Sequence, residues 1–184
     1  ALATSASVAI RNARLHEQTE VRLRHTETLL AESQDASSAL EVTEILRRTT
    51  RAMVRALGAD TGGAWLLSED GSRFVPIVGY HVPKELLGAL ESANLKSLDP
   101  HVSDWRRIAG PVYASHSQDD PRFTHPIARL LPHKSVLIQP MRWKGVAIGG
   151  FALPWLRVHH RFTSEGLGLA GGMAVQAPVA RQNS

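Results

Sequence analysis

The stretch at residues 134–155, KSVLIQPMRWKGVAIGGFALPW, decides the fold. Two runs rich in Val, Ile, Leu and Phe flank a short basic connection with a glycine, which is the pattern of a β-hairpin. Residues 136–138 and 146–148 are consecutive apolar residues, so each strand is expected to be apolar on both faces. Gly149 and Gly150 have no side chain, so another element must approach their backbone closely for the strand to pack. The stretch therefore predicts two central strands of a sheet that is covered on both sides.

Three more strands are predicted before this hairpin. Residues 60–68 (DTGGAWLLS) and 73–80 (RFVPIVGY) flank an Asp-Gly turn signal, which predicts a second hairpin. Pro76 cannot donate a hydrogen bond to a neighbouring strand, so the second of these strands is expected at a sheet edge. Residues 111–115 predict one more short strand, while residues 83–109 are typical of short helices and loops.

A long helix and a second, amphipathic helix are predicted in the N-terminal third. Residues 3–33 contain neither proline nor glycine and are rich in helix-forming residues. The second helix is expected to begin at the capping-box spacing of Ser38 and Glu41 and to end at Gly58. One of its faces is apolar, and the opposite face carries Arg47, Arg48, Arg51 and Arg55. No aromatic residue lies between these arginines to stack on bases, so we interpret them as a solvated surface and expect no nucleic-acid partner.

The C-terminal helix is predicted to begin at Thr163, Ser164 and Glu165. Several glycines weaken it, and Pro178 is expected to kink or end it. An alanine-rich pattern in this region repeats a pattern at the N-terminus at a constant offset, for example Asn12 and Asn183. We interpret the repeat as the last helix of one module continuing into the first helix of the next.

Composition limits the possible chemistry. The chain has 184 residues, of which 43% are hydrophobic, enough for one core. It has no cysteine, which excludes disulfides, thiolate metal sites and thioether-linked cofactors. The longest apolar run, residues 145–156, is too short to span a membrane, so a cytoplasmic protein without a membrane partner is expected. The chain begins at Ala1 rather than Met, which we interpret as a fragment of a longer polypeptide.

The order of these motifs resembles that of a GAF domain, a regulatory module of bacterial signalling proteins, phytochromes and cyclic-nucleotide phosphodiesterases. The resemblance covers about residues 30–184 and rests on the following ordered set: DDPRF at 119–123, KSVLIQPM at 134–141, IGGF at 148–151, RFTSE at 161–165 and the alanine-rich final helix. The segment SVAIRNARLHEQTE at 7–20 resembles the linker helix that follows such a domain in tandem arrays.

The resemblance implies an α+β fold with a central antiparallel sheet of five or six strands. It places the N- and C-terminal helices on one face, and short helices and loops on the other. It also implies a linker or signalling helix at 1–33, a GAF-like domain at 34–184, and a homodimer that forms through terminal helices. Residues of the first helix proposed for this contact are Val8, Leu15 and Leu29, although Arg22 interrupts their heptad row.

The family usually binds its ligand under the loops. Aromatic residues and one histidine in suitable regions are our candidates for that pocket: Trp65, Tyr80, Trp105, Tyr113, Phe123 and His125. Covalent bilin and cysteine-based methionine sulfoxide reduction are excluded because cysteine is absent. Cyclic nucleotides are not expected, because Asn94 is followed by Leu95 where the family's nucleotide-binding members have Asn-Lys.

Haem, metal and catalysis are not expected either. His81, His101, His116, His125 and His133 lie where they could face a pocket, but single histidines are more often structural. His159 and His160 are adjacent and should point apart on an extended segment, which makes a poor chelate. His116 with Asp119 and Asp120 could be imagined as an acid/base set, and Ser115 beside His116 as a nucleophile with its base. Adjacent residues seldom reach the geometry that catalysis needs, so no enzyme activity is expected.

The sequence thus predicts a sensor domain that binds an unidentified small molecule and regulates an effector domain in the same polypeptide. The alternative is a ligand-free dimerisation or protein-interaction module.

Overall fold

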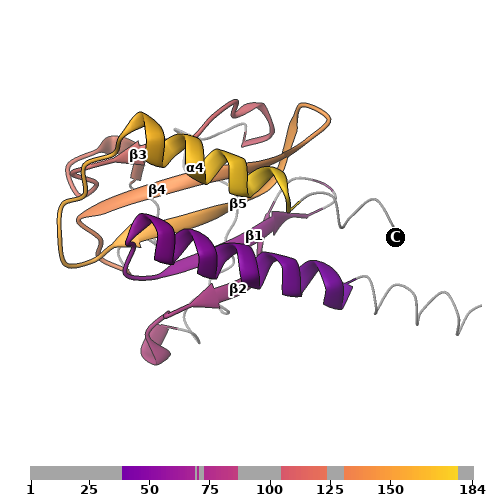
Figure 1. Ribbon diagram of the computed structural model, residues 1–184, viewed down its shortest axis with the longest axis horizontal. Coiled ribbons are helices and arrows are strands. Elements are labelled where there is room, and N and C mark those ends of the chain that lie inside the picture. Colours follow the sequence, from indigo (N-terminus) through magenta and orange to yellow (C-terminus); the bar gives the residue numbers. More distant parts are fainter. Residues whose placement is uncertain (1–38, 69, 71–72, 87–104, 124–130, 178–184) are drawn as a thin grey trace, which may run out of the picture. The chain divides into compact units, whose positions relative to one another are not determined.

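The computed structural model describes residues 39–68, 70, 73–86, 105–123 and 131–177 (Figure 1). All of these except residues 39 and 40 belong to one compact unit, residues 41–183. The expected first helix with Val8, Leu15 and Leu29, the Ser38 cap and the pocket candidate His125 lie outside the described residues.

Five antiparallel strands form one sheet in the order β2-β1-β5-β4-β3 (Figure 1). The strands are β1 (Gly62–Leu67), β2 (Phe74–Tyr80), β3 (Val112–Ala114), β4 (Ser135–Trp143) and β5 (Val146–Trp155). The predicted hairpin at 134–155 is confirmed as β4 and β5, and both strands have neighbours on each side. The edge position of the strand that contains Pro76 is confirmed as well.

The turn between β4 and β5 consists of Lys144 and Gly145, which have φ angles of 47° and 83°. Two consecutive residues with positive φ give the type I′ geometry that matches the twist of a two-residue hairpin. A glycine suits the second position because it has no side chain to clash at positive φ.

Two helices lie side by side on one face of the sheet (Figure 1). The first helix of the described residues, which is the second helix predicted from the sequence, covers residues 39–57. It ends at Gly58, whose φ of 69° is that of a helix C-cap. The second, α4 (Ser164–Val175), is capped by Thr163, whose side chain accepts a hydrogen bond from the Gly166 backbone N–H. The predicted helix ends at Gly58 and Thr163 are therefore confirmed.

The main core lies between these helices and the sheet. Its largest fully buried side chains come from β5, from β4 and from the first helix: Trp155, Phe151, Leu153, Leu137, Met141, Leu46 and Met53. The four arginines of the first helix are exposed, as the amphipathic pattern predicts. Gly62 lets the helix approach β1 closely, because a Cβ there would lie 2.5 Å from Val54 Cγ2.

In the described residues, no helix is long and apolar enough to cross a membrane.

Asp60 joins the end of the first helix to the loop between β5 and α4. Its Oδ2 accepts hydrogen bonds from the backbone N–H groups of Leu156 and Arg157, at 2.8 and 3.2 Å. Its Oδ1 accepts a hydrogen bond of 2.7 Å from Arg157 Nε. Burial alone raises the pKa of Asp60, but the hydrogen bonds from Arg157 and Leu156 outweigh it, and the pKa lies below its ordinary value.

We expect Asp60→Ala to lower the free energy of unfolding by roughly 1–3 kcal/mol, because two backbone N–H groups lose a charged acceptor. Since folding lowers the pKa of this carboxyl, its contribution is complete above the unfolded pKa of about 3.9 and is lost as the pH falls through the folded value. Urea unfolding of both proteins between neutral and acidic pH measures this effect. Arg157→Ala is the control and should cost less, because the Arg157 side chain is 84% exposed.

Candidate functional site

An aromatic cluster covers the sheet face opposite the two helices. The ring centroids of Trp65, Phe74 and Trp105 lie 5.5–5.7 Å apart, and the edge-to-face contacts that Phe74 makes are a favourable aromatic geometry. Trp105 belongs to a short 3₁₀ helix, η2 (Trp105–Arg107), and its Nε1 donates to the Gly149 backbone oxygen at 3.3 Å. Trp65 Nε1 is buried and has no hydrogen-bond partner among the residues described.

Among the pocket candidates that the structure describes, Trp65 and Trp105 are brought into contact with each other. Tyr80 packs with the core on the helix side, stacked on His81 at 4.0 Å. Tyr113 pairs with Leu137 across the β3–β4 ladder and contacts Phe162, which also packs on the helix-side core.

Phe123 ends the short 3₁₀ helix η3 (Pro121–Phe123) and meets His133 edge to face. In the described part of the chain, the aromatic candidates are therefore spread over both faces of the sheet.

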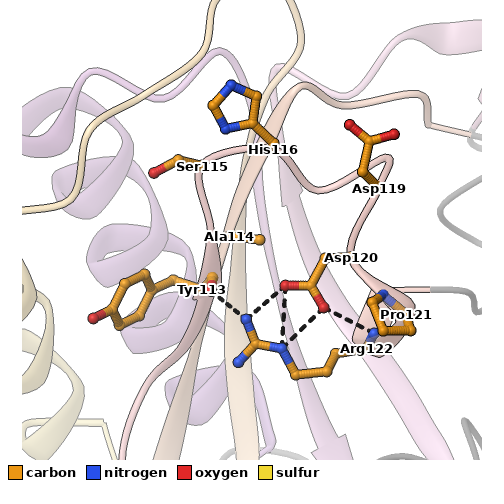
Figure 2. A pocket seen from close by; sticks show the side chains of 8 residues that line it. All are labelled: Tyr113, Ala114, Ser115, His116, Asp119, Asp120, Pro121 and Arg122. Carbon is orange, nitrogen blue, oxygen red and sulfur yellow. Dashed lines mark hydrogen bonds and ion pairs between the residues drawn. The ribbon is translucent and has the colours of Figure 1, made fainter.

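A pocket of about 510 Å³ lies beside β3 and η3 (Figure 2). It is lined by Tyr113, Ala114, Ser115, His116, Asp119, Asp120, Pro121 and Arg122. Figure 2 shows the Arg122 guanidinium facing the Asp120 carboxylate, with which Nε and Nη2 bond at 2.6–3.2 Å. Arg122 Nη2 also donates to the Tyr113 backbone oxygen at 3.0 Å. The side-chain hydrogen bonds from Arg122 lower the pKa of Asp120, so this pair holds the loop against β3 as an ion pair.

The histidines near this pocket make separate contacts. His116 stacks on His159 with centroids 4.3 Å apart, and His159 Nδ1 donates to the Ser115 backbone oxygen at 3.0 Å. His160 instead stacks on Trp155 at 4.2 Å. The expectation that His159 and His160 point apart is therefore confirmed. Within the described ranges, no group of three or more His, Cys, Asp or Glu side chains is placed to hold a metal ion.

A buried serine–histidine pair joins the loop after β3 to the segment before β4. Ser117 Oγ lies 2.6 Å from His133 Nδ1 and donates to the His133 backbone oxygen at 2.8 Å. The Ser117 hydroxyl has a single proton to share between these two acceptors, so the direction of its hydrogen bond with Nδ1 depends on the tautomer of His133. Ser117 is only 1% exposed, so the pair is not accessible to a substrate from solvent. The two residues are 16 positions apart, and no local sequence pattern reveals the pair.

His133 makes stability depend on pH. Burial lowers the pKa of His133 below its ordinary value, because an imidazolium there would lose its hydration. The unfolded chain then binds more protons than the folded chain, so stability is complete above the unfolded pKa of about 6.5 and falls as the pH drops through it. Thermal melts between neutral and acidic pH should show this slope, and His133→Gln should reduce it. The exposed His159→Gln is the control, and an unchanged slope in His133→Gln would contradict the assignment.

The comparisons with known proteins identify the fold. No protein-family model matches the sequence, and no curated protein matches it. Among solved structures, a GAF domain/HD domain protein from Geobacter sulfurreducens is 16% identical with a TM-score of 0.68, over 79% of this chain and 95% of the other. The second GAF domain of DevS from Mycobacterium smegmatis is 21% identical with a TM-score of 0.56, over 77% and 93%.

A third similar structure is the photoproduct state of GAF3 from Slr1393 of Synechocystis, which is 15% identical with a TM-score of 0.62, over 76% of this chain and 92% of that chain. Each of the three similarities covers more than three quarters of this chain. The fold of this chain is therefore that of a GAF domain.

Proposed function

We propose that this chain is a regulatory sensor domain of a multidomain signalling protein, and that it works as a homodimer and responds to a small molecule. The GAF fold supports this, since structures with the same fold include domains of a two-component sensor histidine kinase and of a methyl-accepting chemotaxis protein. In this proposal the helices on one sheet face transmit the signal to an effector domain in the same polypeptide.

The observation that carries the proposal is the outer face of α4. Four successive exposed positions along this face are Gly168, Leu169, Gly172 and Val175. Leu169 is 44% exposed and Val175 is 70% exposed, and Gly168 and Gly172 beside them leave the helix backbone open. An apolar strip with glycines lets two helices pack closely, so a second copy of α4 fits this face.

The first helix offers a different outer surface. Its exposed positions carry arginines, of which Arg47 and Arg48 are paired with Glu44 and Arg51 lies over the Tyr80 ring at 5.5 Å. Packing this surface against its own copy would bring like charges together, which is unfavourable. We therefore assign the dimer contact to α4 rather than to the helix at residues 39–57.

Leu169→Glu tests the dimer, because it places a charge in the centre of the proposed contact. Light scattering at tens of micromolar should give twice 20.1 kDa for the wild type and a monomer for Leu169→Glu. The control is Val146→Glu, because Val146 has the same 44% exposure but lies at the hairpin tip. A wild-type monomer, or a Leu169→Glu dimer of unchanged affinity, would contradict the proposal.

The alternative is a dimerisation module without a ligand. It is favoured by the cluster of Trp65, Phe74 and Trp105, whose side chains fill space over the sheet face where the family usually binds its ligand. Native mass spectrometry and an absorption spectrum of freshly purified protein separate the two functions. A small molecule retained by the purified protein supports the sensor. Protein that carries no small molecule, dimerises fully and binds no added ligand supports the alternative.

A further inference from the structure

A second cavity lies on the helix side of the sheet, between α4 and β4. Its volume is about 330 Å³, at the lower end of the range for small-molecule sites. It is lined by Ala109, Gly110, Pro111, Gln139, Pro140, Arg142, Leu167, Gly171, Ala174 and Val175. Four of these residues belong to α4, so a molecule bound here would contact the helix to which we assign the dimer interface.

Gln139, which lines the cavity, has a buried side-chain oxygen without a hydrogen-bond partner among the described residues. The residue is 5% exposed, and its Nε2 donates to the Pro140 backbone oxygen at 3.2 Å. This bond fixes the orientation of the amide, because the reverse orientation would place two oxygens against each other. Oε1 then has no hydrogen-bond partner within the described part of the chain. A buried amide oxygen without a partner is unfavourable, and a ligand with an N–H or O–H group would supply the missing donor.

Arg142 gives the same cavity a positive charge. Its Nη1 donates to the Ala109 backbone oxygen at 2.8 Å, and its Nη2 donates to the Gly145 backbone oxygen. Both acceptors are neutral, so these bonds do not neutralise the guanidinium. The guanidinium also has further N–H groups, which suit a carboxylate. No acidic residue belongs to the lining, and the other lining residues are apolar apart from Gln139.

We propose that this cavity binds a small organic acid with an apolar body and one N–H or O–H donor. The donor bonds to Gln139 Oε1, the carboxylate meets Arg142, and the body lies against Pro111 and Leu167. This inference deepens the proposed sensor function, because it places the ligand on the helix side and in contact with α4. It does not use the aromatic cluster on the opposite face.

The test uses 4-hydroxyphenylacetate as the probe, with phenylacetate, which lacks the hydroxyl, and 4-methylphenol, which lacks the acid. Binding to the whole chain is measured by two-dimensional NMR titration. We expect saturable chemical-shift changes at Gly110, Gly171 and the Gln139 side-chain amide. Phenylacetate and 4-methylphenol, which each lack one group, should each bind about tenfold more weakly than 4-hydroxyphenylacetate.

Variants locate the site and the role of Gln139. Gly171→Leu should abolish binding, because a Cβ at this position meets no atom within 4 Å and the side chain can extend into the cavity. Ser164→Leu is the control on the same helix, because Ser164 is exposed, does not line the cavity and is not part of the α4 face assigned to the dimer. Gln139→Met should weaken the hydroxylated probe about tenfold and leave phenylacetate unchanged. Circular dichroism melts confirm that each variant folds.

The proposal is overturned if none of the three probes binds the wild type saturably, or if Gly171→Leu and Ser164→Leu bind the probes equally well. It is also overturned if Gln139→Met weakens both acids alike. Light scattering of the same samples shows which of the two proposals fails. A dimer that binds no probe contradicts only the assignment of the cavity, whereas a monomer contradicts the proposed homodimer.

Discussion

Replacing Gly149 with alanine is expected to cost at least about 3 kcal/mol in the free energy of unfolding, the upper end of the range for overpacking. A Cβ at Gly149 would lie 2.3 Å from the Trp65 backbone oxygen and 3.0 Å from Leu66 Cα. These atoms belong to the backbone of the neighbouring strand, so no side-chain rotation relieves the clash. The strands β1 and β5 would have to separate at the centre of the sheet.

Chemical unfolding followed by circular dichroism measures this loss, and Gly171→Ala is the matched control. A Cβ at Gly171 meets no atom within 4 Å, so alanine there should stabilise α4 by up to about 1 kcal/mol. If Gly149→Ala were as stable as the wild type, the close approach of β1 to β5 in this structure would be wrong.

Trp155→Ala should lower the free energy of unfolding by about 3–5 kcal/mol, as expected for removal of a large buried aromatic side chain. Trp155 is 1% exposed at the end of β5, with the His160 ring stacked on it at 4.2 Å and the Phe162 ring edge-on at 5.3 Å. Its loss leaves a cavity beneath the segment that leads from β5 to α4.

The effect of Trp155→Ala is measured by urea unfolding followed by far-ultraviolet circular dichroism, because removal of a tryptophan changes the fluorescence signal. Val158→Ala in the same connecting segment is the control: Val158 is 56% exposed, so its truncation should change stability by less than about 0.5 kcal/mol. Similar losses in the two variants would show that Trp155 does not hold this segment in the core.

The sheet and its covering could be predicted from the sequence because the signals are local. The apolar runs of the hairpin at 134–155, the proline in β2 and the caps at Gly58 and Thr163 each depend on neighbouring residues alone. Amphipathic spacing in the first helix also fixed which face is buried, since a helix exposes one side of a regular repeat.

The candidate sites could not be predicted in the same way, because they depend on which strands become neighbours and on which face each side chain points. Tyr80 and Trp65 lie on adjacent strands, yet they face opposite sides, with a register shift between Ala64 and Trp65. A one-residue shift reverses the face of every later side chain, and sequence alone does not locate it. The pairing of Ser117 with His133 and the orphan oxygen of Gln139 likewise arise only from tertiary packing.

The central claim, that a second copy packs on the outer face of α4, is tested most directly by single-cysteine cross-linking. The chain has no native cysteine, so Leu169→Cys is the only thiol in its variant. In a two-fold contact through α4, mild oxidation should convert Leu169→Cys largely into a disulfide-linked dimer, while Val146→Cys, of equal exposure, stays monomeric under denaturing conditions. Equal and slow cross-linking of the two variants would contradict the account.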